Sequence, residues 1–178
     1  MRLTKSTFML WVGMLLCLIP GPRSFAKDLA RERQAVAAVI DASIGWFKNK
    51  DFELLFRVFS PSPDLFLFQP TSTTTIVGGD AFRKFAEVWK NPHLAYERHE
   101  IRDLRIDFSP HRDVAWFSAL LDDCARSGEK TGCWKDTRWT GVLLKRKAGW
   151  EVIQMHFSFA ADQVAAAKKA GPEASRQE

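Results

Sequence analysis

The sequence predicts an α+β fold, in which two to three N-terminal helices precede a sheet of long antiparallel strands. Apolar residues recur every three or four positions early in the chain, and every second position from about residue 96. The 178 residues suffice for one domain, and 46% hydrophobic residues with 7 Trp and 14 Phe indicate a substantial core or an aromatic-lined cavity. This composition excludes a disordered polymer, a collagen and a coiled coil.

Residues 1–26 have the layout of a secretory signal peptide. Arg2 and Lys5 precede an apolar run of 12 residues, and Ser24 and Ala26 are small residues at the positions that a signal peptidase reads. A transmembrane anchor is the alternative, but spanning a bilayer takes about 20 apolar residues. We therefore expect cleavage after Ala26, export to the periplasm or the medium, and no membrane anchor after cleavage.

The charge pattern excludes a nucleic-acid-binding protein. Cleavage would lower the formal net charge from +5 to +2, because residues 1–26 carry three basic and no acidic side chains. The remaining Lys and Arg residues alternate with acids, as in residues 97–103, instead of forming one basic stripe. The chain also lacks a phosphate-binding glycine loop, a nucleophile elbow and a convincing metal-ligand spacing. We expect neither a cofactor nor a metal.

Two cysteines remain after cleavage, and their positions indicate a disulfide. Cys124 and Cys133 flank a polar segment with two glycines, residues 126–132, which lies between the strand-like segments 114–121 and 134–144. An even number of cysteines in an exported chain favours a structural bridge across the base of this hairpin. A redox pair or a metal site is the alternative, but there is no Cys-x-x-Cys and no histidine at ligand spacing.

The first part of the mature chain predicts three helices and two short strands. Apolar residues at helical spacing indicate a helix over residues 27–49 and a second over residues 52–59, with Asp51 as its N-cap. A third helix is predicted to begin at Asp80 as N-cap and to end before Asn91 and Pro92. The short strands are expected at residues 65–69 and 76–77.

The second part of the chain predicts long strands joined by turns. Alternating polarity indicates strands over residues 99–108, 114–122, 134–146 and 150–159, with a hairpin turn at residues 147–149. We expect one domain over residues 27–160, followed by a polar C-terminal tail over residues 161–178 that forms a frayed helix or stays disordered.

The last predicted hairpin groups several polar side chains on one face. A turn at residues 147–149 pairs Arg146 with Trp150. The same register pairs Val142 with Gln154, Thr140 with His156 and Arg138 with Ser158. The polar patch that results consists of Arg138, Thr140, Gln154, His156 and Ser158. If Cys124 lies opposite Cys133, the same pairing can be continued toward the start of that strand. It then adds Phe117, Ala119 and Leu121 to this face, unless a bulge intervenes. The opposite face carries Trp139, Met155, Phe157 and Phe159, which are too apolar to remain in water.

Several segments resemble a known superfamily. They are Phe-Glu-Leu-Leu-Phe at residues 52–56, Gly-Asp-Ala-Phe at residues 79–82, and the C-terminal strands at residues 138–145 and 149–158. In this order they resemble the SnoaL-like and ketosteroid-isomerase-like superfamily, with the nuclear transport factor two-like fold, over roughly residues 32–160. The resemblance implies a cone-shaped, curved antiparallel sheet, a cystatin-like α+β barrel, whose helices enclose a conical pocket. Members include isomerases, dehydratases, cyclases, hydrolases and association domains.

The resemblance places the candidate site on the concave face of the sheet. His156 is the predicted acid–base, and Arg138 is predicted to bind a carboxylate or to stabilise an enolate. The remaining predicted ligand-binding residues are Gln69, Trp116, Phe117, Thr140, Gln154 and Ser158.

The chain departs from ketosteroid isomerase at the positions that carry that activity. Gln69 stands before Pro70 where the family has its base, and an amide cannot take the proton. The single tyrosine, Tyr96, lies outside the first helix, and the central strand offers no aspartate before Asp122.

These observations leave three functions open. The first is an exported module that binds a small apolar or amphipathic molecule. The second is a lyase, isomerase or cyclase with His156 as acid–base. The third is an assembly domain that forms a homodimer through the outer face of the sheet.

Overall fold

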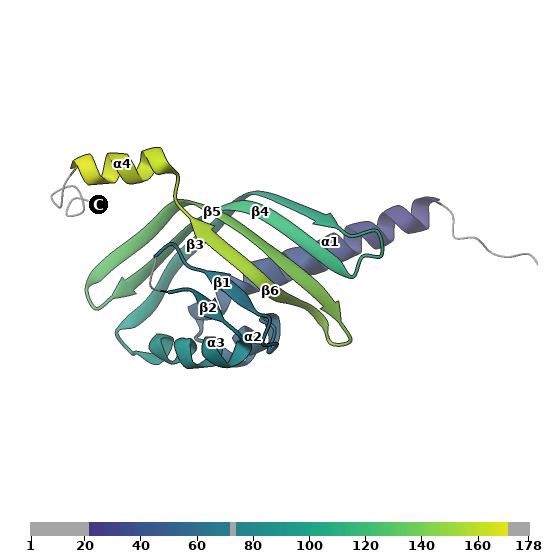
Figure 1. Cartoon of the computed structure of the whole chain (residues 1–178), viewed down its shortest axis with the longest axis horizontal. Coiled ribbons are helices and arrows are strands. Elements are labelled where there is room, and N and C mark those ends of the chain that lie inside the picture. The colour runs from purple at the N-terminus through teal and green to yellow at the C-terminus, as the bar shows by residue number, and fades with distance from the viewer. Residues whose placement is uncertain (1–21, 72–73, 171–178) are drawn as a thin grey trace, which may run out of the picture.

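The computed structural model describes residues 22–71 and 74–170, which form one curved, open sheet with helices packed against one face (Figure 1). The strand order is β2-β1-β6-β5-β4-β3, and all neighbours are antiparallel except β1 and β6. In chain order the elements are α1 (Pro22–Gly45), η1 (Trp46–Lys48), α2 (Phe52–Val58), β1 (Phe66–Phe68), β2 (Ile76–Val77), α3 (Gly79–Ala86), η2 (Glu87–Lys90), β3 (Leu94–Phe108), β4 (Val114–Ser127), β5 (Lys130–Arg146), β6 (Gly149–Ser158) and α4 (Ala161–Ala170). The predicted α+β class, with helices before a meander of strands, is confirmed.

The structure describes only part of the predicted signal peptide and of the predicted C-terminal tail. Residues 1–21 of the predicted signal peptide lie outside the described residues, and residues 22–26 begin α1. Of the predicted tail, residues 161–170 form α4, and residues 171–178 lie outside the described part. No helix within the described residues is long and apolar enough to span a membrane.

Helix α1 is held to the sheet by its apolar stripe and by two polar anchors. Val36 and Ile40 are fully buried in the core. The Glu32 carboxylate accepts hydrogen bonds from the Lys145 ammonium group and from Trp150 Nε1, the latter at 3.0 Å. These partners hold the pKa of Glu32 below its usual range, with the Lys145 bond as the main cause.

The short helices begin where capping chemistry allows. Asp51 caps α2 as predicted, since its Oδ1 accepts a hydrogen bond from the Leu54 N–H at 2.9 Å. The prediction of Asp80 as N-cap of α3 is wrong, because the N-cap is Gly78, two residues earlier, with φ of 89°, and Asp80 lies in the first turn. A Cβ on Gly79 would lie 2.5 Å from the Pro61 carbonyl oxygen, so the pair of glycines lets the chain pass this turn.

The central strands extend further than predicted. β4 and β5 pair past the disulfide as far as Ser127 and Lys130, and Gly128, with φ of 64°, makes the turn between them. The polar residues of this hairpin therefore belong to strands, because backbone pairing across the hairpin outweighs their low strand propensity. Cys124 and Cys133 lie directly opposite each other and are bonded, which confirms the predicted disulfide.

Two bulges decide which side chains face the helices. The pairs Val142–Gln154, Thr140–His156 and Arg138–Ser158 are confirmed. The predicted pairing of Arg146 with Trp150 is wrong, because a bulge next to Val142 leaves a two-residue turn between Arg146 and Gly149. A second bulge lies in β5 between the pairs Leu121–Thr137 and Asp123–Trp134, and this extra residue of β5 shifts the register toward the disulfide by one residue. A one-residue shift moves a whole set of side chains to the other face.

The predicted assignment of the two faces is consequently wrong. Trp139, Met155 and Phe157 are at most 6% exposed and lie on the inner face, toward the helices. The polar patch Arg138, Thr140, Gln154, His156 and Ser158 alternates with them along β5 and β6, and so lies on the outer face. Burial of the bulkier apolar set provides the larger hydrophobic gain, which explains the choice.

Candidate functional site

A cavity of about 640 Å³ lies between the helices and the inner face of the sheet. Its walls come from α1, η1, α2, α3, η2, β1, β3, β4, β5 and β6. The volume falls within the range of about 300–1,000 Å³ that is typical of small-molecule sites.

Most of the cavity wall is aromatic or aliphatic. Trp46 packs edge-on against Trp89, with their ring centroids 5.3 Å apart, and Trp134 packs against Phe157 at 6.1 Å. The remaining apolar lining residues are Ile44, Phe47, Leu55, Phe59, Leu67, Phe82, Leu94, Ala125 and Met155. Such a wall favours a flat or elongated apolar molecule over a strongly hydrated one.

Few polar side chains interrupt this wall. The Ser43 hydroxyl donates to the Ile40 carbonyl at 2.7 Å and is thus satisfied within its own helix. Gln69, one of the predicted ligand-binding residues, lines the cavity directly after β1. Asp123 lines it from β4 and accepts no hydrogen bond from any residue that the structure describes.

Asp123 is the ionisable group in the interior of the site. It lies opposite His99 on β3 and opposite Trp134 on β5. Burial raises the pKa of Asp123 above its usual range, and the neighbouring His99 counteracts part of this rise. A carboxyl group held in an apolar cavity with a raised pKa is a candidate for ligand recognition or proton transfer.

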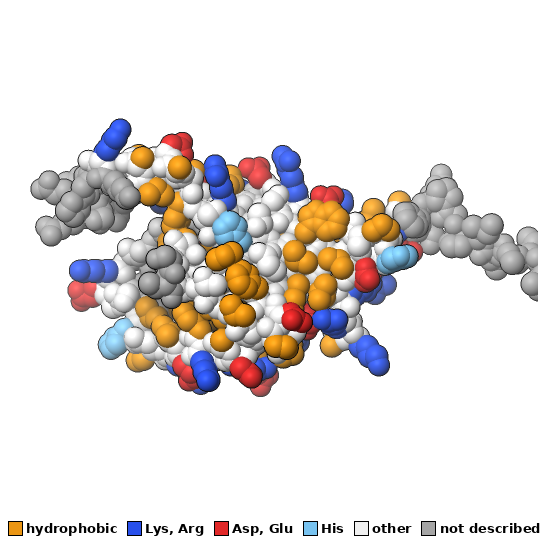
Figure 2. Space-filling view, viewed as in Figure 1, with side chains coloured by type: hydrophobic (Ala, Val, Ile, Leu, Met, Phe, Trp, Pro, Cys, Tyr) orange, Lys and Arg blue, Asp and Glu red, His pale blue; other side chains and the backbone are white. Residues whose placement is uncertain are grey.

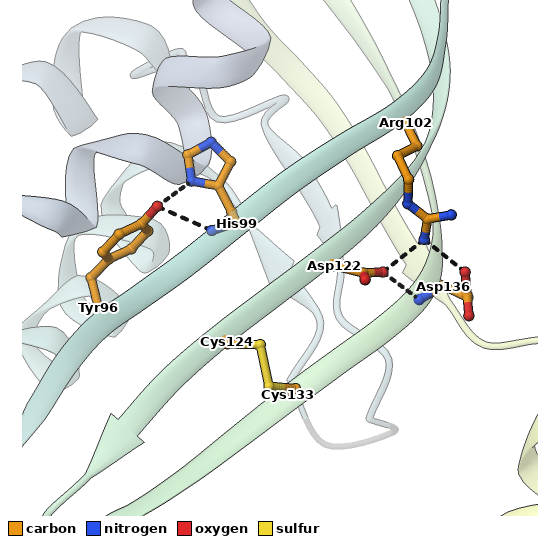
Figure 3. The surroundings of a disulfide bond; sticks show 7 residues. All are labelled: Tyr96, His99, Arg102, Asp122, Cys124, Cys133 and Asp136. Atoms are coloured by element: carbon orange, nitrogen blue, oxygen red, sulfur yellow. Dashed lines mark hydrogen bonds and ion pairs between the residues drawn. A yellow bond between two sulfur atoms is a disulfide. The ribbon is translucent and has the colours of Figure 1, made fainter. Parts of the chain in front are cut away.

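His99 is fixed by partners on both of its ring nitrogens. Figure 3 shows the Tyr96 hydroxyl between the backbone N–H and the ring of His99, and these distances are 3.0 Å and 3.1 Å. The other ring nitrogen, Nε2, lies 3.0 Å from Oδ1 of Asp41 on α1. The cluster joins α1 to β3 and holds His99 beside Asp123.

The β4–β5 hairpin forms the exposed rim of the cavity. Arg126, Ser127, Lys130, Thr131 and Gly132 contribute to this rim, next to the disulfide that Figure 3 shows between the two strands. The Gly128 N–H donates to the His93 carbonyl at 2.9 Å, which ties the hairpin tip to the start of β3. Arg126 is paired with Glu97 at 3.1 Å.

Asp122 and Asp123 point to opposite faces. Asp122 accepts from the Asp136 backbone N–H at 2.8 Å and from Arg102 at 2.9 Å, and these bonds lower its pKa (Figure 3). The sequence prediction considered Asp122 and missed Asp123, although Asp123 lies two residues after the buried Leu121 and so shares its face of β4. Its occurrence in a strand of otherwise apolar inward residues was the signal that could have found it.

The predicted site residues do not meet in the cavity. Of the predicted set, the cavity wall contains Gln69 alone, and Phe117 is buried in the core against Trp139. His156 and Ser158 line a shallower groove of about 410 Å³ on the outer face, where the Phe68 ring lies 5.9 Å from the His156 ring. Neither the cavity nor the groove is lined by Arg138, Trp116, Thr140 or Gln154.

The functional roles assigned to these residues stay predictions. The expectation that the concave face carries them is wrong, because the bulges in the sheet were not foreseeable from pair counting. Within the part of the chain that the structure describes, no group of three or more His, Cys, Asp or Glu side chains could hold a metal ion.

Solved structures with a similar fold come from several bacteria. One from Novosphingobium aromaticivorans, provisionally described as a scytalone dehydratase, has 15% identity and a TM-score of 0.63, over 74% of this chain and 86% of that one. A nuclear transport factor two-like protein from Cytophaga hutchinsonii has 17% identity and a TM-score of 0.57, over 72% and 98%. A provisional calcium/calmodulin-dependent protein kinase II association domain from Xanthomonas campestris has 17% identity and a TM-score of 0.58, over 71% and 86%.

At these identities the structural similarities establish the fold alone. No curated protein matches the chain. The model of the SnoaL-like domain family, in contrast, matches residues 36–162, a span that contains the core of α1, the whole sheet and every residue of the cavity wall. The chain therefore belongs to the SnoaL-like domain family.

Proposed function

We propose that this protein binds a small apolar or amphipathic molecule in the cavity between its helices and the inner face of its sheet. The observation that carries the proposal is a largely aromatic cavity of about 640 Å³ in an otherwise well-packed domain. Asp123 and Gln69 supply its few polar contacts. Small-molecule sites usually combine an apolar wall with a small number of polar groups that orient the ligand.

Fluorescence titration with anilinonaphthalene sulfonate tests this proposal, together with native mass spectrometry of protein purified from its own host. Ala125 lines the cavity from β4, and Ala125→Trp should weaken dye binding about tenfold or more by filling the space. Ser118→Trp is the matched control, because Ser118 is exposed on the outer face of the same strand. Absence of both a co-purified molecule and dye binding would refute the proposal.

We also propose export and a homodimer formed through the outer face of the sheet. The Cys124–Cys133 disulfide supports an oxidising compartment. Trp116 and Phe68 are 46% and 45% exposed on the outer face, and Figure 2 shows hydrophobic side chains over much of the middle of this view. Two proteins of similar fold are described as association domains.

Sedimentation velocity at micromolar concentration tests the dimer. The wild-type protein should sediment as a dimer, and Trp116→Glu should convert it to a monomer because a charge would be buried at the interface. Val88→Glu is the control, since Val88 is 56% exposed in η2, away from the sheet. A monomeric wild-type protein would remove the proposal.

The enzymatic alternative keeps His156 as an acid–base. The groove that contains His156, Ser158 and Gln69 would then be the reaction site, with Phe68 beside the imidazole. On an identified substrate, His156→Ala should lower turnover by about 10²-fold or more. An unchanged rate would exclude this role.

A further inference from the structure

We infer that the ligand of the cavity carries a cationic nitrogen, a protonated amine, which pairs with the Asp123 carboxylate while its apolar body packs against the aromatic walls. This inference rests on the proposed binding function and adds the chemical class of the ligand. It assigns Asp123 a role in recognition.

The first support is the missing partner of Asp123. Its carboxylate lines the cavity and receives neither a hydrogen bond nor an ion pair from the described residues. An unpaired carboxylate among apolar side chains is unfavourable, so a sequence that keeps one in a cavity offers an acceptor to a ligand. By comparison, Asp122 next to it is fully engaged by Arg102 and the Asp136 N–H.

The second support is the aromatic surroundings of that carboxylate. Trp134 lies directly opposite Asp123 on β5, and its ring contacts Phe157 and Phe159 at centroid distances of 6.1 Å and 6.2 Å. Aromatic faces attract ammonium groups and disfavour anions. The carboxylate and the indole together fit a cation with an apolar body.

The third support is that the other charged groups near the cavity have other partners or lie on its exposed rim. His99 on β3 is held between Asp41 and Tyr96. On the hairpin, Glu97 pairs with Arg126, and Lys130 lies on the exposed rim. No protein cation is therefore bonded to Asp123 from β3, from β5 or from the hairpin within the described residues.

Three fluorescent probes with one bicyclic body test the inference on the full chain. Naphthylethylamine, naphthylethanol and naphthylacetate differ in carrying an ammonium, a hydroxyl or a carboxylate group. At neutral pH the amine should bind the wild-type protein about tenfold or more tighter than the alcohol, as expected for a charge-assisted hydrogen bond, and the acid should bind weakest.

The matched variants are Asp123→Asn and Asp107→Asn. Asp123→Asn is nearly isosteric and should bring the affinity ratio of amine to alcohol close to one while alcohol binding persists. Asp107 is exposed on β3, opposite Trp116 on the outer face, so its variant should keep the wild-type ratio.

The possible results separate the two proposals. If the alcohol or the acid binds the wild-type protein as tightly as the amine, the cation inference is overturned and the binding function stands. An amine preference that survives in Asp123→Asn also overturns the assignment to this residue. If none of the three probes binds, both proposals fail.

Discussion

Asp123 keeps an acidic side chain against an apolar wall, which lowers the stability of the fold at neutral pH. Its raised pKa means that the folded protein favours the protonated form. Protonation of Asp123 therefore stabilises the folded protein relative to the unfolded chain. This contribution is fully present below the ordinary carboxyl pKa of about 3.9, and it is lost as the pH rises through the raised pKa of the folded protein. A binding residue that weakens its own fold is a common sign of function.

We predict that Asp123→Asn raises the free energy of unfolding at neutral pH by about 1 kcal/mol, the lower end of the penalty for burying an unpaired polar group. The difference between variant and wild type should shrink as the pH falls toward 4, because the wild-type carboxyl then becomes neutral. Urea unfolding of both proteins across this pH range measures it. A less stable variant at neutral pH would contradict the assignment of an unpaired carboxylate.

Gly141 is required by packing and not by backbone conformation. A Cβ at this position would lie 2.5 Å from Cε1 of Phe117 and 2.8 Å from the Gln154 carbonyl oxygen. We predict that Gly141→Ala lowers the free energy of unfolding by about 1–3 kcal/mol, as overpacking usually does.

Gly132→Ala is the matched control for this prediction. It lies in the same strand, β5, but an added Cβ would meet nothing within 4 Å. Its effect should stay within about 0.5 kcal/mol. Equal losses for the two variants in thermal or urea unfolding would show that strand propensity, and not the contact with Phe117, determines the effect.

At the scale of elements, the β4–β5 hairpin links stability to the shape of the cavity. The strands supply Asp123 and Trp134 to the interior and the exposed residues to the rim. The Cys124–Cys133 bridge and the bond from Gly128 to His93 hold this hairpin in place. Loss of either should loosen the rim before it affects the core.

We predict that Cys124→Ser with Cys133→Ser lowers the free energy of unfolding by about 2–3 kcal/mol, the chain-entropy value for a ring of this size. Protein from an oxidising compartment should have a mass two hydrogens below that of the reduced chain. Anilinonaphthalene sulfonate should bind the double variant severalfold more weakly under conditions where it remains folded. Two free thiols in exported protein would contradict the bridge.

At the scale of the whole molecule, α1 contains the predicted cleavage site after Ala26 and continues into the folded domain. The sheet anchors of α1 begin at Glu32, which binds Lys145 and Trp150, and at Arg33, which donates to the Ile106 carbonyl at 3.2 Å. Cleavage after Ala26 would leave the domain intact.

We predict that the exported protein begins at Lys27. N-terminal sequencing of protein recovered from the medium or the periplasm checks this, and its unfolding midpoint should equal that of a chain expressed from Lys27 onward. An exported protein that retains residues 1–26 would contradict the predicted cleavage. A chain from Lys27 that unfolds at a clearly lower denaturant concentration would show that earlier residues stabilise the domain.

Local patterns were sufficient for the class of the fold. Helical spacing of apolar residues predicted α1 and α2, the Asp51 cap followed from a side chain that bonds three residues ahead, and the even number of mature cysteines predicted the disulfide. In each case the chemistry lies within a few neighbouring residues. Pairing of β5 with β6 was predicted correctly from Val142–Gln154 to Arg138–Ser158, but it was wrong by one residue next to the turn, where Arg146 pairs with Gly149.

By itself, the sequence determined the α+β order of elements, the pairing of Thr140 with His156 and the bond between Cys124 and Cys133. Only the tertiary structure decided which face of the sheet is inside, and with it that Asp123 lines the cavity and His156 does not. The physical reason is that a strand has a period of two, so one extra residue at Ile153 of β6 puts Trp150 and Val152 on the same face as Met155 and Phe157. Whether a bulge forms depends on packing against helices far away in the chain, and no local pattern encodes it.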